Sequence, residues 1–150
     1  MSLYYVSVDA IALTAATAKT VLEIATPSTA DIRILEWWMD FDGVTASAVP
    51  VKVEMGRFSA AVTTATSITP AKLINTASPA SGCTVKHTTS TEGAGTVSDL
   101  TINRRISPTT GFHYVAPLGN EMYVALSTFW RMRITAAAGV NVTVGVIWNE

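Results

Sequence analysis

The pattern that most restricts the fold of this chain lies at its C-terminus. Apolar side chains occupy every second position: Val140, Val142, Val144, Val146 and Trp148, with Asn141, Thr143, Gly145 and Ile147 between them. Successive side chains of a β-strand point to opposite faces of the sheet, so a period of two residues places one set together. The pattern therefore predicts a β-strand with one buried face.

The preceding segment, residues 129–135, alternates in the same way. Trp130, Met132 and Ile134 fall on one face, and Phe129, Arg131 and Arg133 fall on the other. The short sequence of residues 136–139, three alanines and a glycine, then predicts a hairpin loop between the two strands.

The rest of the chain also indicates strands. A long strand is predicted from Ile32 to Phe41, with its partner marked by alternating apolar residues between Val49 and Met55. Six shorter strands are expected between turns rich in Ser, Thr, Pro and Gly: Leu3–Val8, Ala18–Ala25, Thr84–Thr89, Val97–Arg105, Phe112–Val115 and Met122–Leu126. The best helix candidate is one turn at Pro70–Ile74, and Ser59–Gly95 is predicted to form long loops around one strand.

Eight to ten short strands in 150 residues predict one all-β domain spanning residues 1–150. An antiparallel β-sandwich is the natural closure for such a chain. This number of strands favours a jelly roll of about eight strands over a small open sheet.

Composition bears on the partners of the chain. Charged residues make up 14% and hydrophobic residues 49% of the sequence, and the mean hydropathy is +0.34. Because a typical domain has about 25% charged residues, the apolar excess predicts contacts between subunits in a homo-oligomer. The net charge of −1 gives little basis for direct binding of nucleic acid. No apolar run approaches the ~18 to 20 residues of a membrane helix, so we expect no membrane partner.

Two further features point to the compartment in which the chain is made. The N-terminal residues lack the basic start and apolar core of a secretion signal. The single cysteine, Cys83, has no intramolecular disulfide partner and no activating base nearby in the sequence. These features predict synthesis in the cytoplasm and an inert thiol.

Patterns for catalysis and metal binding are weak. His87 and His113 have no Cys, Asp or Glu at metal-ligand spacing, and nothing indicates a Ser-His-Asp triad. Asp40 and Asp42 would share one face of a strand, but Ca²⁺ takes six to eight oxygen ligands. A strand ending in the turn Asp42-Gly43 is the favoured interpretation. We therefore predict no catalytic residue, no cofactor, no metal and no enzymatic activity.

Four residues are predicted to take part in an interface. Trp37 and Trp38 are adjacent and must point to opposite faces of their strand, so one should enter the core while the other lies under a second element or is exposed. An exposed tryptophan can anchor a protein interface or stack on a sugar. Arg131 and Arg133 share a face and are predicted to form ion pairs between subunits.

Three segments carry a resemblance to a known class of proteins: Ile34–Gly43 (ILEWWMDFDG), Val51–Phe58 (VKVEMGRF) and Ile134–Val146 (ITAAAGVNVTVGV). In these segments, and in its abundance of Thr, Ala and Val, the chain resembles small virion proteins of tailed bacteriophages. The resemblance is strongest to head decoration or minor capsid proteins of phages that infect actinobacteria. It implies a β-sandwich or jelly-roll subunit of the virion, often trimeric, that binds the major capsid protein and reinforces the shell.

Three classes of function are compared. The leading hypothesis is a structural virion protein, a capsid decoration or minor capsid protein that forms a trimer and stabilises the major capsid shell. Tail or head-completion structural proteins are variants of it. The alternative is a carbohydrate-binding module that stacks a sugar on Trp37, Trp38, Trp130 or Trp148, with Asp40 or Asp42 as the polar partner. A cupin-type enzyme is disfavoured because it needs more histidines than the two present.

Overall fold

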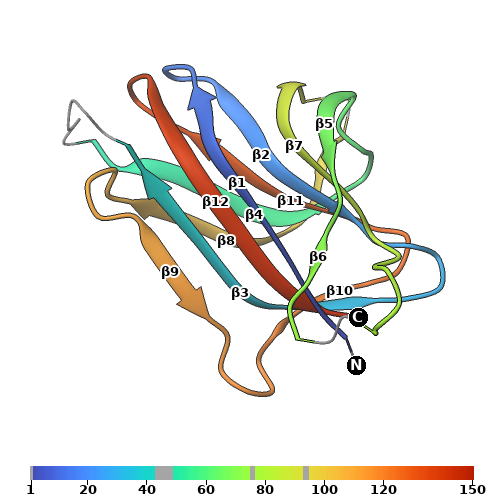
Figure 1. The fold of residues 1–150 in the computed structure, drawn as a ribbon. Coiled ribbons are helices and arrows are strands. Elements are labelled where there is room, and N and C mark those ends of the chain that lie inside the picture. The colour runs from blue at the N-terminus through green and yellow to red at the C-terminus, as the bar shows by residue number, and fades with distance from the viewer. Residues whose placement is uncertain (1, 43–48, 75–76, 93–94) are drawn as a thin grey trace.

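The computed structural model describes residues 2–42, 49–74, 77–92 and 95–150. These residues form two antiparallel β-sheets packed face to face (Figure 1). Sheet A contains β1 (Leu3–Leu13), β3 (Ile32–Phe41), β6 (Ala71–Lys72), β9 (Phe112–Val115), β10 (Met122–Val124) and β12 (Val140–Asn149). Sheet B contains β2 (Ala18–Ala25), β4 (Val51–Phe58), β5 (Thr64–Ile68), β7 (Thr84–Thr91), β8 (Val97–Ile106) and β11 (Phe129–Thr135). The predicted all-β antiparallel sandwich is confirmed. None of the described residues belongs to a helix with the length and apolar character needed to cross a membrane.

The main strands pair in a nested order. The first strand, β1, pairs with the last, β12, and β2 pairs with β11. Inside these pairs, β3 pairs with β9 and β10, and β4 pairs with β8. The strand order is β10-β3-β12-β1-β6 in sheet A, with β9 also on β3, and β5-β7-β2-β11-β4-β8 in sheet B. Most consecutive strands therefore lie in opposite sheets.

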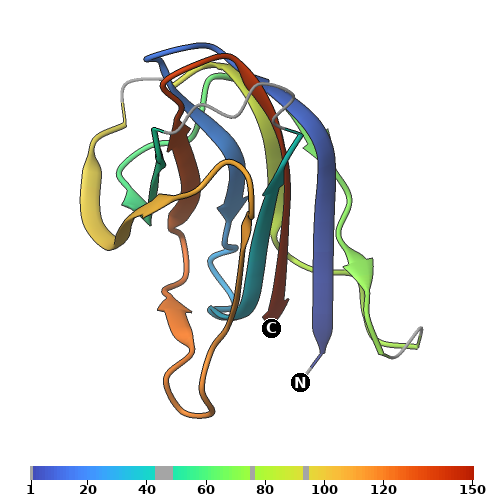
Figure 2. The same cartoon turned by 90° about the vertical axis from the view of Figure 1, so that its left-hand side faces the viewer.

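Strands β9 and β10 are two halves of one edge strand. Phe112–Val115 pairs with the second half of β3, and Met122–Val124 pairs with its first half. Residues 116–121 interrupt this edge strand, and we refer to them as the edge loop. Figure 2 shows the edge loop, in orange, reaching beyond the ends of the neighbouring strands.

The core lies between the two sheets, and β12 contributes its predicted apolar face to it. Val142, Val144, Val146 and Trp148 are fully buried, which confirms the alternation near the C-terminus. β12 lies between β1 and β3, and Trp148 packs at 6.0 Å, between ring centroids, from Tyr4 of β1. Burying a large apolar side chain contributes about 1.5–3 kcal/mol, so this row makes a large contribution to stability.

β1 continues beyond its predicted end at Val8 and contains a β-bulge. Val8 pairs with Val144 and Ile11 pairs with Val142, so β1 has one residue more than β12 between these pairs. Ala10, inside the bulge, has a φ of 50°. The extra residue changes which alternate positions of β1 face the core. Val6 and Val8 are buried before the bulge, and Ile11 and Leu13 are buried after it.

Two predicted pairings are wrong. Residues 136–139 do not close a hairpin, because β11 belongs to sheet B and β12 to sheet A. The strands Ile32–Phe41 and Val51–Phe58 are not partners either, because they too lie in different sheets. The predicted alternation of apolar residues is confirmed in β4, β11 and β12. Alternation fixes which face of a strand is buried but not which sheet the strand joins.

The segment Ser59–Gly95 contains more regular structure than predicted. The expected strand is present as β7, but β5 and β6 were missed. The predicted helical turn at Pro70–Ile74 is wrong, because Ala71 and Lys72 pair with Tyr5 and Tyr4 at the edge of sheet A. Pairing with an exposed strand edge supplied hydrogen bonds that the local sequence did not reveal.

Candidate functional site

The two adjacent tryptophans of β3 point to opposite faces, as predicted. Trp37 enters the core, is 1% exposed, and packs with ring centroids 5.1 Å from Phe112 and 5.8 Å from Tyr114. Trp38 lies on the outer face of sheet A and is partly exposed. Trp130 and Trp148 are fully buried. Of the four tryptophans, Trp38 is therefore the one that a ligand can reach.

Trp38 lies across a glycine. Gly145 of β12 is its direct neighbour in the antiparallel pair, and a Cβ at Gly145 would overlap three carbons of the indole ring. The benzene part of the indole therefore covers the backbone of β12. Covering a strand glycine with an aromatic ring from the next strand is a known stabilising arrangement in sheets.

Polar groups surround the indole of Trp38 in an open hollow. The hollow is lined by Glu36, Trp38, Asp40, His113 and Ile147. The His113 ring meets the Trp38 ring edge to face, with centroids 6.3 Å apart and an angle of 85° between the planes. The Nε2 atom of His113 is 2.6 Å from Oε1 of Glu36, a contact that becomes an ion pair when the imidazole is protonated.

The two aspartates at the end of β3 have different environments. Asp40 is exposed and lines the hollow beside Trp38. Asp42 accepts hydrogen bonds from the backbone N–H of Asn141 at 2.9 Å and from its side-chain Nδ2 at 2.7 Å. Asp42 therefore fixes the start of β12, which leaves Asp40 as the candidate polar partner for a sugar. The predicted turn residue Gly43 lies outside the described residues.

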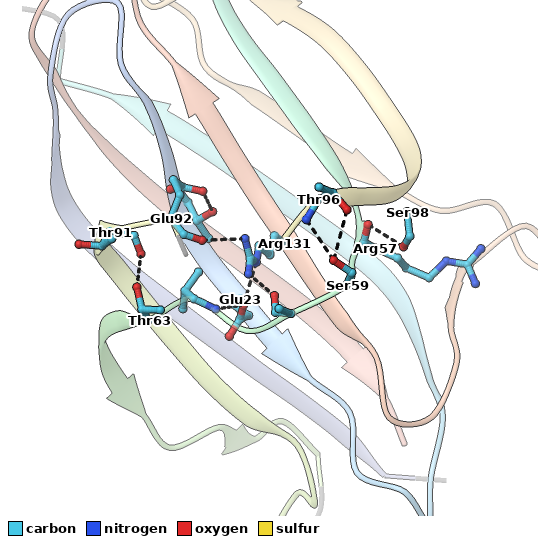
Figure 3. A network of polar contacts seen from close by, with 12 residues as sticks. Glu23, Arg57, Ser59, Thr63, Thr91, Glu92, Thr96, Ser98 and Arg131 are labelled. Carbon is cyan, nitrogen blue, oxygen red and sulfur yellow. Dashed lines mark hydrogen bonds and ion pairs between the residues drawn. The ribbon is translucent and has the colours of Figure 1, made fainter. Parts of the chain in front are cut away.

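A buried ion pair lies on the outer face of sheet B (Figure 3). Arg131 of β11 and Glu23 of β2 each have a side chain that is 1% exposed, and Nε of Arg131 donates to Oε2 of Glu23 at 2.8 Å. The Arg131 guanidinium also donates to the backbone carbonyl oxygens of Ala60 and, at 3.2 Å, of Glu92. The backbone N–H of Val62 donates to the same Oε2 of Glu23 at 2.8 Å. The ion pair therefore holds two crossing segments, after β4 and after β7, on the sheet.

Neighbouring contacts reinforce these crossings. The Glu92 carboxylate accepts hydrogen bonds from the backbone N–H and, at 2.6 Å, from the hydroxyl of Thr20 on β2. Ser59 Oγ accepts from the backbone N–H of Thr96 at 3.0 Å. The Arg131 guanidinium lies 4.5 Å above the ring centroid of Phe58. Within the described residues, Oε1 of Glu23 is buried without a hydrogen-bond partner.

Burial changes the set of predicted interface residues. Trp37 and Arg131 are covered by their own chain, so in the folded subunit neither side chain is exposed for the predicted contact with a partner. For Arg131 the reason is the segment after β4, which folds back over the outer face of sheet B. The sequence of this segment has no apolar pattern that would have predicted its position. Trp38 and Arg133 remain partly exposed and stay predicted contacts.

Arg133 is paired within its own sheet. Its guanidinium lies 3.2 Å from the Glu54 carboxylate, which also contacts Lys52 Nζ at 2.9 Å. Burial disfavours the charged form of Glu54, but the hydrogen bond from Lys52 and the positive charges of Arg133 and Lys52 outweigh it. The pKa of Glu54 is therefore below its ordinary value.

The remaining titratable candidates are far apart in the fold. His87 lies on β7 in sheet B and His113 on β9 in sheet A. Burial lowers the pKa of His87, whose Nδ1 lies 2.8 Å from the Thr88 hydroxyl. Burial and the Glu150 carboxylate raise the pKa of the Cys83 thiol to about 12, so Cys83 is protonated at neutral pH. Across the described part of the chain, no group of three or more His, Cys, Asp or Glu could hold a metal ion.

Exposed apolar side chains occur in and around the edge loop. Leu118 in the loop is 97% exposed, and Val115 immediately before it is 60% exposed. Tyr123 and Leu126, which follow the loop, are 48% and 52% exposed. The sequence predicted the two flanking strands but not this surface, because the local pattern does not show that Val115 and Tyr123 face solvent from β9 and β10 or that Leu118 projects in the loop between them.

Comparison with protein-family models, with curated proteins and with solved structures finds no match to this chain.

Proposed function

We propose that the β-sandwich is a jelly roll. The nested pairs β1–β12, β2–β11, β3–β9 and β4–β8 support this assignment. This is the pairing that results when one long antiparallel hairpin is rolled so that its strands alternate between two sheets. The strands β5, β6 and β7 are then an insertion between β4 and β8. Jelly rolls are common in viral capsid and lectin domains.

On this framework we propose that the chain is a structural virion protein, a capsid decoration or minor capsid protein that forms a homo-oligomer and binds the major capsid shell. The observation that carries the proposal is the apolar surface at the edge loop, where Leu118 is 97% exposed. Exposed apolar side chains on and beside a projecting loop are typical of a surface that a protein partner covers. A trimer and a capsid partner are what the resemblance to phage decoration proteins implies.

The total apolar content of the chain supports an oligomer less strongly than the exposed apolar residues at the edge loop do. The accessible surface of the chain is 7307 Å². A compact monomer of 15.9 kDa has about 7,400 Å² by the usual scaling with mass. The total accessible area is therefore that of an ordinary compact monomer and gives no separate support for an oligomer. Support for an oligomer comes from where the exposed apolar residues lie, rather than from how many there are.

Light scattering on the purified protein through a dilution series tests the proposal. We expect an oligomer, with the trimer mass the specific prediction, that persists at micromolar concentration. Leu118→Ser should dissociate it, because a hydroxymethyl group replaces the most exposed apolar side chain of the edge loop. Leu73→Ser at the opposite edge of sheet A is the matched control and should leave the mass unchanged.

A second measurement addresses the capsid. The protein should co-sediment with the capsids of the virus whose genome carries it, and Leu118→Ser should reduce the bound fraction. A monomer at all concentrations that also fails to co-sediment would contradict the proposal.

A further inference from the structure

We propose that the outer face of sheet A carries a glycan-binding site in which Trp38 stacks on a neutral pyranose ring and Asp40 accepts hydrogen bonds from its hydroxyl groups. The site lies on the outer face of β3 and β12, and none of the residues that line it belongs to the edge loop. The inference is independent of the virion role, because it concerns a ligand rather than assembly.

The first argument is the position of the indole. The ring lies over Gly145, so one of its faces packs on the backbone of β12 and the other is directed away from the sheet. A flat, rigid aromatic face held in this way presents a large apolar area at little entropic cost. The C–H face of a pyranose is the complementary surface, since its hydrogens lie above the ring plane and its equatorial hydroxyls point outward.

The second argument is the polar groups around the indole. Asp40 and Glu36 lie on the same strand as Trp38, at two residues on either side, and both line the hollow with it. Within the described residues, the exposed Asp40 carboxylate has no hydrogen-bond or ion-pair partner. A carboxylate with free lone pairs beside an aromatic face can accept two hydroxyl hydrogens from one sugar. A few polar groups beside an apolar surface are typical of ligand sites.

The same hollow is less suited to a cation. Recognition of a quaternary ammonium group generally uses a cage of several aromatic rings, whereas here one indole is accompanied by one imidazole. The carboxylate of Glu36 already contacts His113 at 2.6 Å. The lining therefore offers a single unpaired carboxylate and one stacking face, which matches a neutral sugar.

The test uses tryptophan fluorescence and isothermal titration calorimetry with a panel of soluble neutral oligosaccharides: glucans, mannans, xylans and N-acetylglucosamine oligomers. Because the other three tryptophans are buried, a ligand at this site should change the emission of Trp38 alone. We expect at least one class to bind. Trp38→Ala should weaken its binding at least about tenfold. Tyr123→Ala, an exposed aromatic outside the hollow, should bind normally.

Two further variants keep the test decisive if Trp38→Ala fails to fold. Asp40→Asn leaves the sheet intact and should weaken binding severalfold. Gly145→Ala should push the indole away from the backbone of β12 and weaken binding although the ring is still present. Absence of binding across the panel would overturn the proposal, as would glycan binding that none of these variants affects. Choline or a lysine-rich peptide that binds while every glycan is silent would overturn it in favour of a cation site.

Discussion

The two sheets of the sandwich differ in how their outer faces are completed. The centre of sheet B is covered by its own chain, and the outward residue Arg131 there is fully buried. Sheet A is open at the corresponding place, where Trp38 lines a hollow. The usual arrangement is reversed, since the charged residue is buried and the large aromatic residue meets solvent.

The difference shows what a covering segment requires of the face beneath it. The segments after β4 and β7 bring the carbonyl groups of Ala60 and Glu92 and the N–H of Val62 onto sheet B. Buried backbone groups need hydrogen-bond partners, which apolar side chains cannot provide. The pair Arg131–Glu23 provides them. Within the described residues, no segment covers the indole of Trp38, which lines an open hollow, so sheet A needs no such pair there.

The largest expected effect comes from breaking the buried pair on the covered face. Arg131→Met leaves the Glu23 carboxylate buried without its cation, and we expect the free energy of unfolding to fall by about 3–5 kcal/mol. Urea unfolding followed by circular dichroism measures it. The matched control is Arg57→Met, which removes a half-exposed cation paired with Asp99 and should cost no more than about 1 kcal/mol. Equal losses in the two variants would show that the covering segments do not depend on Arg131.

The double variant Arg131→Met/Glu23→Leu sharpens this result. With both charges removed, part of the stability should return relative to Arg131→Met alone, because no unpaired charge remains buried. Recovery should be incomplete, since Val62 and Ala60 still lose their side-chain partners. A double variant less stable than Arg131→Met would contradict the assignment of the loss to a buried charge.

A smaller difference is expected between two glycines, one in each sheet. A Cβ at Gly56 of β4 would overlap the backbone carbonyl of Asp99, so Gly56→Ala must displace β8. We expect a loss of about 1–3 kcal/mol. The three atoms nearest to a Cβ at Gly145 all belong to the indole of Trp38, which can swing into solvent, so Gly145→Ala should change stability by less than about 1 kcal/mol. Thermal or urea unfolding of both variants measures the contrast, and a reversed order would contradict it.

The smallest effect is the pH dependence contributed by Glu54. Its pKa is lowered in the folded chain, so its contribution to stability is present above the unfolded pKa of about 4.3 and is lost as the pH falls through the folded pKa. Glu54→Gln should therefore destabilise the protein by up to about 1 kcal/mol at pH 7 and by less at pH 3. Urea unfolding of both proteins at the two pH values measures this. An unchanged gap between them would contradict the charge contribution.

Much of the architecture could be predicted from local pattern. The alternation in residues 129–135 and 140–148 correctly gave two strands and their buried faces, and it placed Arg131 and Arg133 together on the outer face. The partners of these strands could not be predicted, because strands of similar pattern can pair in many ways. The burial of Arg131 could not be predicted either. It depends on residues 60–62, whose hydrogen bonds to Glu23 and Arg131 are made by backbone atoms.

The orientation of the two tryptophans of β3 depends partly on the sequence and partly on the tertiary structure. Adjacent positions on a strand must point to opposite faces, so the sequence alone determined that one indole enters the core and one does not. Regular alternation from Ile32 and Ile34 would turn Trp38 inward. In the structure Trp148 pairs with Ile34 and Ile147 pairs with Glu36, so Leu35 is an extra residue that reverses the parity of the strand. The bulge is a property of the pairing between β3 and β12, which the sequence of β3 alone does not show, and it places Trp37 in the core and Trp38 on the surface.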